Sequence, residues 1–176
     1  ADSLFFSFRS PYSYLAIERL REFEVMPVLR PVLPMVMRGL PVPRLKVMAL
    51  VKDAAREAER LGLPFGRIAD PLGTGVERAL ALFFAARSRG TEREFATQCM
   101  RAIWTRGQPL DDDAVLRELA SACGIEDWQG ALADSSWKEE AQNNRAALLE
   151  AGHWGVPTYT RDGEAFWGQD RLPWLG

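Results

Sequence analysis

The chain begins with a short apolar run, ends with two more, and has the periodicity of helices between them. Residues 4–8 form a nearly continuous apolar segment, which is typical of a strand covered on both faces. Behind Ser10 and Pro11, apolar residues recur at helical spacing to about Phe23, and a second strand is predicted from Val25 to Leu33. The prolines within that strand favour a position near a sheet edge. The start of the chain therefore predicts a βαβ unit.

Residues 38–151 alternate between helical periodicity and signals that end helices, which predicts an all-helical segment. Apolar positions recur behind Pro43, and the run stops at Gly62. Thr74 and Thr91 are each followed three positions later by Glu, which is the spacing of a capping box. We therefore expect one helix to begin at each of these two threonines.

The end of the chain returns to strand and turn chemistry. Two short apolar runs flank an Asp-Gly pair at positions 162–163, a strong hairpin signal, and a helix is predicted to begin near Gln169. This order predicts an α/β chain with a thioredoxin-like fold (βαβ…ββα) interrupted by an all-helical insertion domain. The discontinuous thioredoxin-like domain would comprise residues 1–37 and 152–176, and the insertion residues 38–151.

Composition and charge indicate a globular protein with a small-molecule partner. Of the 176 residues, 47% are hydrophobic and 26% are charged. The 22 basic and 24 acidic residues give a formal net charge of -2, so no field gathers nucleic acid or anionic lipid. The sequence shows neither a run of apolar residues long enough for a membrane span nor the features of a secretory leader. We therefore expect a cytoplasmic protein without nucleic-acid or membrane partners.

The few cysteine and histidine residues restrict the chemistry further. Cys99 and Cys123 lack CxxC spacing, and His153 is the single histidine, so neither a disulfide framework nor a metal site is predicted. Both cysteines fall on apolar helical faces, and we expect them to pack in the core.

A hydroxyl group stands at the junction between the first strand and the first helix, at Ser10. Backbone N–H groups and the helix dipole favour an anion at such a position. Ser10 is either a helix cap or a donor to a bound thiolate, in which case it lowers the pKa of the thiol. Because neither Ser10 nor Ser13 is a cysteine, disulfide exchange by a protein thiolate is excluded here, and a thiol must come from outside.

A second motif precedes the predicted hairpin, where Pro157 follows Gly155 and Val156. The proline is either a plain turn residue or part of a cis peptide bond, which is the state of about 5% of such bonds. A cis Val156–Pro157 bond would leave the backbone groups of Val156 unpaired, ready to hydrogen-bond an extended peptide as an added strand.

Three segments, residues 10–16, 155–158 and 166–172, together resemble one protein family in their order and spacing. They resemble the 2-hydroxychromene-2-carboxylate isomerases, which belong with the kappa-class glutathione transferases and the DsbA-type disulfide oxidoreductases. The resemblance covers essentially the whole chain. It implies a thioredoxin-like fold, glutathione as cofactor, and cis-trans isomerisation by reversible thiolate addition to an aryl-substituted unsaturated pyruvate.

The resemblance also implies the residues of the site. Ser10 is expected to be the catalytic contact to the sulfur, Val156 to pair with the tripeptide, and Asp170 to meet its ammonium group. The residues expected to bind glutathione are Ser10, Pro11, Lys46, Trp154, Val156, Pro157, Gln169 and Asp170. The substrate pocket is expected to comprise Tyr12, Arg44, Trp104 and Trp167. Solvated helix starts for the two basic residues, and plain core positions for Trp104 and Trp167, are the alternatives.

Two departures from the family leave alternatives open. Relatives place an Asn in the loop after the second strand, and residues 38–43 contain none. The alternatives to an isomerase are a kappa-like glutathione transferase or peroxidase and a non-catalytic glutathione-binding protein. Gln169 stands where relatives usually have Asn or Ser, and its amide can still donate and accept. The relatives also suggest a homodimer.

Overall fold

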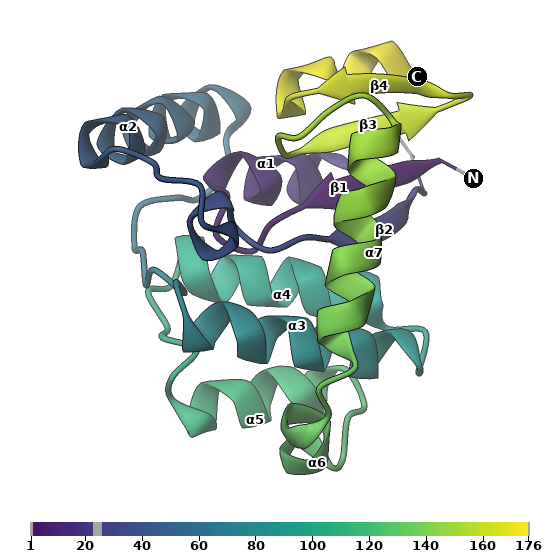
Figure 1. The fold of residues 1–176 in the computed structure, drawn as a ribbon. Coiled ribbons are helices and arrows are strands. Elements are labelled where there is room, and N and C mark those ends of the chain that lie inside the picture. The colour runs from purple at the N-terminus through teal and green to yellow at the C-terminus, as the bar shows by residue number, and fades with distance from the viewer. Residues whose placement is uncertain (1, 23–25, 176) are drawn as a thin grey trace.

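The two ends of the chain meet in one four-stranded sheet (Figure 1). The computed structural model describes residues 2–22 and 26–175. The strands are β1 (Ser3–Phe6), β2 (Val28–Pro31), β3 (Thr158–Arg161) and β4 (Glu164–Trp167), in the order β2-β1-β3-β4. Strand β1 pairs in parallel with β2 and antiparallel with β3, which in turn pairs antiparallel with β4. Strand β1 is buried throughout, which explains its apolar run without alternation.

Helix α1 (Pro11–Arg19) connects the two parallel strands, as the predicted βαβ unit requires. The helix and strand β2 are both shorter than predicted, and Phe23 and Val25 lie outside the described residues. Proline supplies no backbone N–H for a ladder, so β2 ends at Pro31.

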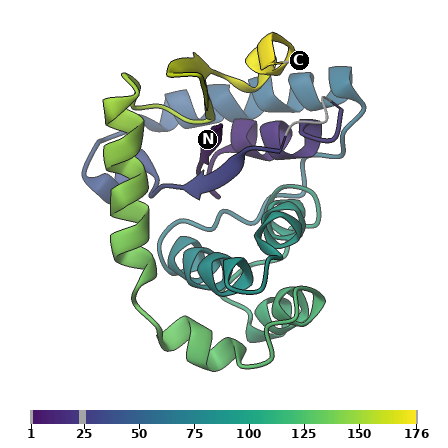
Figure 2. The same ribbon diagram turned by 90° about the vertical axis from the view of Figure 1, so that its right-hand side faces the viewer.

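Between β2 and β3 the described chain consists of helices and loops, which confirms the predicted helical insertion in a thioredoxin-like fold. The elements are η1 (Met35–Arg38), α2 (Arg44–Leu61), α3 (Thr74–Arg87), α4 (Glu92–Trp104), α5 (Asp113–Ala122), α6 (Trp128–Ala133) and α7 (Trp137–Glu150). Figures 1 and 2 show α3, α4 and α5 stacked away from the sheet, α7 returning to it, and α2 lying alongside α1. No helix in the described part of the chain is long and apolar enough to span a membrane. The domain boundaries at residues 38 and 152 stay a prediction.

Both predicted capping boxes are wrong, although the two helices begin close to the predicted threonines. The N-cap of α3 is Gly73, one residue before Thr74, and the side chain of Thr91 does not cap α4. Thr91 Oγ1 instead donates to the carbonyls of Ala86 and Cys123, at 3.2 and 2.8 Å. A hydroxyl beside other helix ends has competing backbone acceptors, and here they replace the cap.

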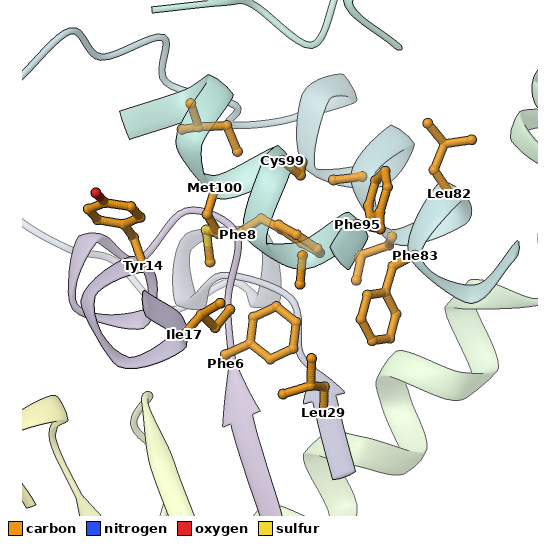
Figure 3. Close-up of a cluster of buried hydrophobic side chains, with 14 of the residues drawn as sticks. Phe6, Phe8, Tyr14, Ile17, Leu29, Leu82, Phe83, Phe95, Cys99 and Met100 are labelled. Carbon is orange, nitrogen blue, oxygen red and sulfur yellow. The ribbon is translucent and has the colours of Figure 1, made fainter. Parts of the chain in front are cut away.

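Aromatic packing in the core fixes the turn that leads into α1 (Figure 3). Phe6 and Phe8 meet edge to face at 5.2 Å, and Phe8 lies 6.2 Å from both Phe83 of α3 and Phe95 of α4. Such edge-on contacts add to the stabilisation gained from burying the rings. Because Phe8 is fully buried two positions before Ser10, the helical layer holds the start of α1 in place.

Candidate functional site

A cavity of about 830 Å³ lies between the start of α1, helix α2 and the start of η2 (Gln169–Leu175). This volume is within the usual range of small-molecule sites, about 300–1,000 Å³. Every residue predicted for the site lines the cavity except Arg44. Arg44 is exposed in the first turn of α2, and the structure does not bring it into the lining.

Ser10 is the N-cap of α1 and also lines the cavity, so a role as helix cap and a role as donor to a bound thiolate are compatible with each other. Its Oγ accepts from the backbone N–H of Ser13 at 3.1 Å, and Pro11 occupies the first helical position. Ser13 Oγ in turn accepts from the backbone N–H of Ser7 at 3.2 Å, which stiffens the turn. Since the cap uses Ser10 as an acceptor, its hydroxyl hydrogen is available to donate into the cavity.

The Val156–Pro157 peptide bond is cis, which is the second of the two states considered from the sequence, and both residues line the same cavity as Ser10. The carbonyl of Pro157 accepts from the backbone N–H of Gly168 at 2.9 Å. Thr158 Oγ1 donates to the carbonyl of Gly155 at 2.7 Å. Within the described part of the chain, no protein group hydrogen-bonds to the backbone N–H or C=O of Val156. An extended peptide backbone is the natural partner for such a pair of groups.

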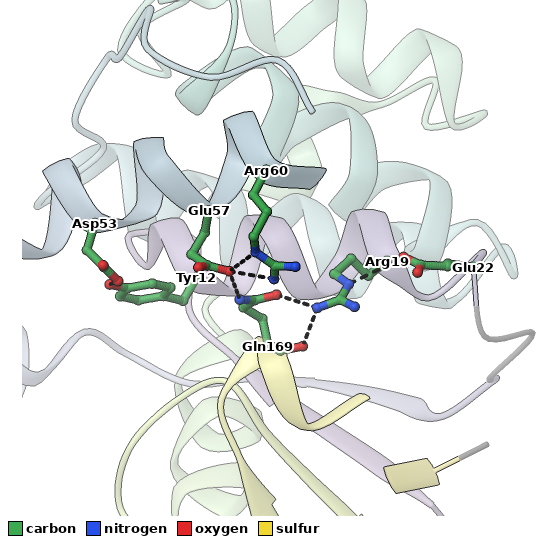
Figure 4. Close-up of polar contacts among 7 residues, drawn as sticks. All are labelled: Tyr12, Arg19, Glu22, Asp53, Glu57, Arg60 and Gln169. Carbon is green, nitrogen blue, oxygen red and sulfur yellow. Dashed lines mark hydrogen bonds and ion pairs between the residues drawn. The ribbon is translucent and has the colours of Figure 1, made fainter. Parts of the chain in front are cut away.

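Tyr12 joins α1 to α2 beside the cavity (Figure 4). Its hydroxyl donates to the carboxylate of Asp53. Burial, this hydrogen bond, and the charges of Asp53, Glu57 and Asp170 raise the pKa of Tyr12 well above its usual value, so the phenol stays protonated. We call these three carboxylates the acidic corner; all three line the cavity. Their combined charge suits a cationic group such as an ammonium.

Gln169 of η2 forms hydrogen bonds to both α1 and α2 beside the acidic corner (Figure 4). Its Nε2 donates to Glu57 Oε2 at 3.1 Å, and its Oε1 accepts from Arg19 Nη1 at 2.7 Å. A hydrogen bond from Arg60 lowers the pKa of Glu57, which keeps that carboxylate charged. Both ends of the Gln169 amide are therefore engaged with protein groups, and direct contact of this amide with a ligand stays a prediction.

The exposed Asp170 depends on a glycine two positions earlier. Gly168 has a φ of +105°, and a Cβ at that position would come within 2.5 Å of Asp170 Oδ1. Glycine thus leaves room for the Asp170 carboxylate at the cavity wall.

The cavity also contains basic residues with different partners. Lys46 is exposed in the first turns of α2. Arg9 forms a bidentate ion pair with Asp70, in which Nε and Nη2 donate to the two carboxylate oxygens at 3.0 and 3.1 Å. Of these two cations, Lys46 rather than Arg9 is therefore the one placed to bind an incoming carboxylate.

Aromatic rings make up much of the remaining wall. Trp154 and Trp167 are 52% and 54% exposed, and His153 lies 5.7 and 5.0 Å from their ring centroids. Trp104 is only 3% exposed, stacks on Phe65 at 6.0 Å, and presents little surface to the cavity. The two exposed tryptophans are thus the rings on which a flat molecule can stack.

Neither cysteine belongs to the site. Cys99 and Cys123 are buried, as predicted, and burial raises the pKa of the Cys123 thiol to about 11. No group of His, Cys, Asp and Glu side chains among the described residues is arranged to hold a metal ion.

Among the charged lining residues that sequence reasoning missed are Arg38, Asp53 and Glu57. Asp53 and Glu57 are four positions apart and so share one face of α2. That spacing was the available signal, but a charged helical face is also what a solvated helix shows. Arg38 is the first residue of the loop, residues 38–43, in which relatives carry Asn, and it is also the last residue of η1, which was not predicted.

Comparison with known proteins gives one family and several structures of the same fold. The family model of the DSBA-like thioredoxin domain matches residues 3–175. A structure of a 2-hydroxychromene-2-carboxylate isomerase is similar with a TM-score of 0.80 and 23% identity, covering 99% of this chain and 91% of that chain. A probable DsbA oxidoreductase from Streptomyces coelicolor gives a TM-score of 0.73 and 15% identity, covering 99% and 86%.

A third similar structure was solved with a thiol ligand. The cytosolic disulfide reductase DsbM from Pseudomonas aeruginosa with GSH has a TM-score of 0.66 and 17% identity, covering 94% of this chain and 87% of that chain. No curated protein matches the chain by sequence. Identities this low show a shared fold rather than a shared reaction. With its nearly complete match to the family model, the chain belongs to the DsbA-like thioredoxin domain family.

Proposed function

We propose that the cavity binds glutathione and that the protein uses it to isomerise an aryl-substituted unsaturated pyruvate from cis to trans. The observation that carries this proposal is the convergence of Ser10 and the Val156–Pro157 segment on one cavity. Because the chain has no cysteine at Ser10 or Ser13, a free thiol is the reactive group that this arrangement lacks.

The lining residues fit the chemical groups of glutathione. The unpaired backbone groups of Val156 match the peptide backbone, and the acidic corner matches the ammonium of the γ-glutamyl end. Lys46 is available for the glycyl carboxylate, and the Ser10 hydroxyl for the sulfur. The structure of DsbM with GSH shows that a member of this fold binds the tripeptide.

When bound, glutathione would supply the thiolate that a reversible addition to the conjugated double bond requires, and Ser10, Val156 and Asp170 are the residues that would hold it. Ser10 would stabilise the thiolate by donating its hydroxyl hydrogen, assisted by the N-terminal end of α1. Trp154 and Trp167 would stack on the aryl ring and hold the acceptor carbon near the sulfur.

A turnover assay tests this function. The protein is incubated with 2-hydroxychromene-2-carboxylate and a substoichiometric amount of glutathione, and isomerisation is followed by ultraviolet absorbance. We expect turnover that requires glutathione, leaves its concentration unchanged, and falls in Ser10→Ala.

Parallel incubations separate the alternatives. Consumption of glutathione with a chloroarene or a hydroperoxide, without isomerisation, would instead assign a transferase or a peroxidase. Calorimetric binding of glutathione without any turnover would indicate a binding protein. Failure to bind glutathione at all would overturn the proposal.

A further inference from the structure

Arg38 lines the cavity with a guanidinium group that lacks a partner. It is the last residue of η1 and is half-buried, and its Nε is fully buried with no hydrogen-bond partner among the described residues. None of the ion pairs in the described part of the chain includes Arg38. Burying a charged group without a counter-charge is costly, and Arg38 lines the cavity, so an anion there could neutralise it.

The charge of a second arginine acts on Arg38. Burial, and then the charge of Arg145 on α7, lower the pKa of Arg38 below its usual value. Arginine nevertheless remains protonated at neutral pH. An anion bound to Arg38 in the cavity would therefore neutralise its charge and relieve the repulsion between the two guanidinium groups.

The other arginines of the cavity that pair with carboxylates show the contrast. Arg9 is paired with Asp70, and Arg60 with Glu57. Their charges are neutralised locally, whereas that of Arg38 is not.

The lining residues that are close to Arg38 in sequence are apolar. The apolar lining residues on either side of Arg38 in the sequence are Pro34, Met35, Val36, Val42 and Val47. Along α2, Val47 lies six residues from Asp53 and ten from Glu57, which correspond to about 9 and 15 Å, so this apolar position and the acidic residues follow one another along the helix. An apolar wall strengthens an ion pair and also accepts a hydrocarbon ring.

We propose that Arg38, supported by the charge of Arg145, binds the carboxylate of the acceptor substrate and so selects aryl carboxylates over neutral aryl compounds. The planar guanidinium matches the two oxygens of a carboxylate, while the attached ring packs on the apolar wall. The identity of the acceptor as an unsaturated pyruvate rests on the proposed function, whereas the preference for a carboxylate rests on Arg38.

Equilibrium binding without glutathione tests this inference. The wild-type protein is titrated by calorimetry with 2-naphthoate and with 2-naphthamide, which has the same shape without the charge. We expect the carboxylate to bind about 10-fold or more tightly, as a hydrogen-bonded charge pair implies. Arg38→Gln should remove this preference, and Arg38→Lys should retain part of it.

Matched variants separate a local effect from a general loss of charge. Arg44→Gln removes a nearby exposed cation outside the lining and should leave the preference unchanged. Arg145→Gln should reduce it by about 2- to 5-fold, because that charge acts at longer range. If Arg38→Gln does not fold, judged by circular dichroism, the Arg38→Lys and Arg145→Gln titrations decide the question.

Glutathione titrations distinguish failure of this inference from failure of the proposed function. Equal affinity of the two naphthalene probes for the wild type, or an unchanged preference in Arg38→Gln, would overturn the role of Arg38. Loss of glutathione affinity in Arg38→Gln would assign the residue to the tripeptide instead and would equally overturn it. A wild-type protein that prefers 2-naphthoate but does not bind glutathione would retain the role of Arg38 and refute the proposed function.

Discussion

Two substitutions at Ser10 separate its role as a helix cap from its proposed role as a thiolate donor. Ser10→Ala removes the Oγ that accepts from Ser13 N–H at 3.1 Å, and we expect it to lower the free energy of unfolding by about 1 kcal/mol. Ser10→Gly should lower it by only a few tenths of a kcal/mol, because glycine is tolerated at N-caps, as the roughly similar preferences of glycine and threonine show. The thiolate donor is lost equally in both.

The effect on bound glutathione follows from the same hydrogen bond. A hydrogen bond to a charged group contributes about 1.5–3 kcal/mol, and one pKa unit corresponds to about 1.4 kcal/mol. The pKa of the bound thiol should therefore rise by about 1 to 2 in both variants. Ultraviolet absorbance of the thiolate, followed against pH with saturating protein, measures this pKa, and urea unfolding measures stability.

The matched control is a helix cap away from the cavity. Asp112 caps α5 by accepting from the backbone N–H of Ala114 at 2.9 Å, and it is not among the lining residues. Asp112→Ala should lower stability to a similar extent and leave the bound thiol pKa unchanged. The reasoning is refuted if the thiol pKa is the same in the wild type and in both Ser10 variants, since Ser10 would then be a cap alone.

Three further experiments test the hydrogen bonds of Gln169, the burial of the two cysteines and the unpaired hydroxyl of Tyr159. Gln169→Ala removes hydrogen bonds that join α1, α2 and η2, and one of these is to the Arg19 guanidinium. The substitution should lower the free energy of unfolding in urea by about 2–3 kcal/mol. A loss near zero would contradict this role of Gln169. Burial raises the pKa of Cys123 to about 11 and raises that of Cys99 further. A chromogenic disulfide reagent should therefore modify neither thiol in the folded protein at neutral pH and should react faster only as the pH approaches 11. Rapid labelling at neutral pH would show instead that the thiols are accessible. The buried hydroxyl of Tyr159 has no hydrogen-bond partner among the described residues, and Tyr159→Phe should stabilise the protein by about 1 kcal/mol in thermal unfolding, where clear destabilisation would argue against that environment.

The order of elements could be predicted because each boundary depends on local chemistry. Gly62 ends α2 with a φ of +70°, as the glycine signal predicts. Asp162 and Gly163 form the hairpin turn with φ values of 51° and 84°. The element at Gln169 is a 3-10 helix rather than the predicted α-helix, and Pro173 within it is incompatible with a regular helix. Where tertiary partners compete with local ones, as at Thr91, the local prediction was wrong.

The site was predictable where its chemistry lies at the ends of elements. Ser10 and Pro157 each stand beside a strand or helix end, and the fold brings those ends to one cavity. Arg44 and Lys46 are two positions apart on α2 and therefore point in different directions, so only Lys46 lines the cavity. The unpaired state of the Arg38 Nε depends on tertiary structure, which no local pattern encodes.

The proposed function depends on where the sulfur of glutathione binds. A crystal structure of the protein with bound glutathione tests this most directly. We predict the sulfur within hydrogen-bond distance of Ser10 Oγ, the cysteinyl backbone paired with Val156, and the ammonium group beside Asp170. A tripeptide bound outside the cavity, or inside it with its sulfur directed away from Ser10, would contradict the account.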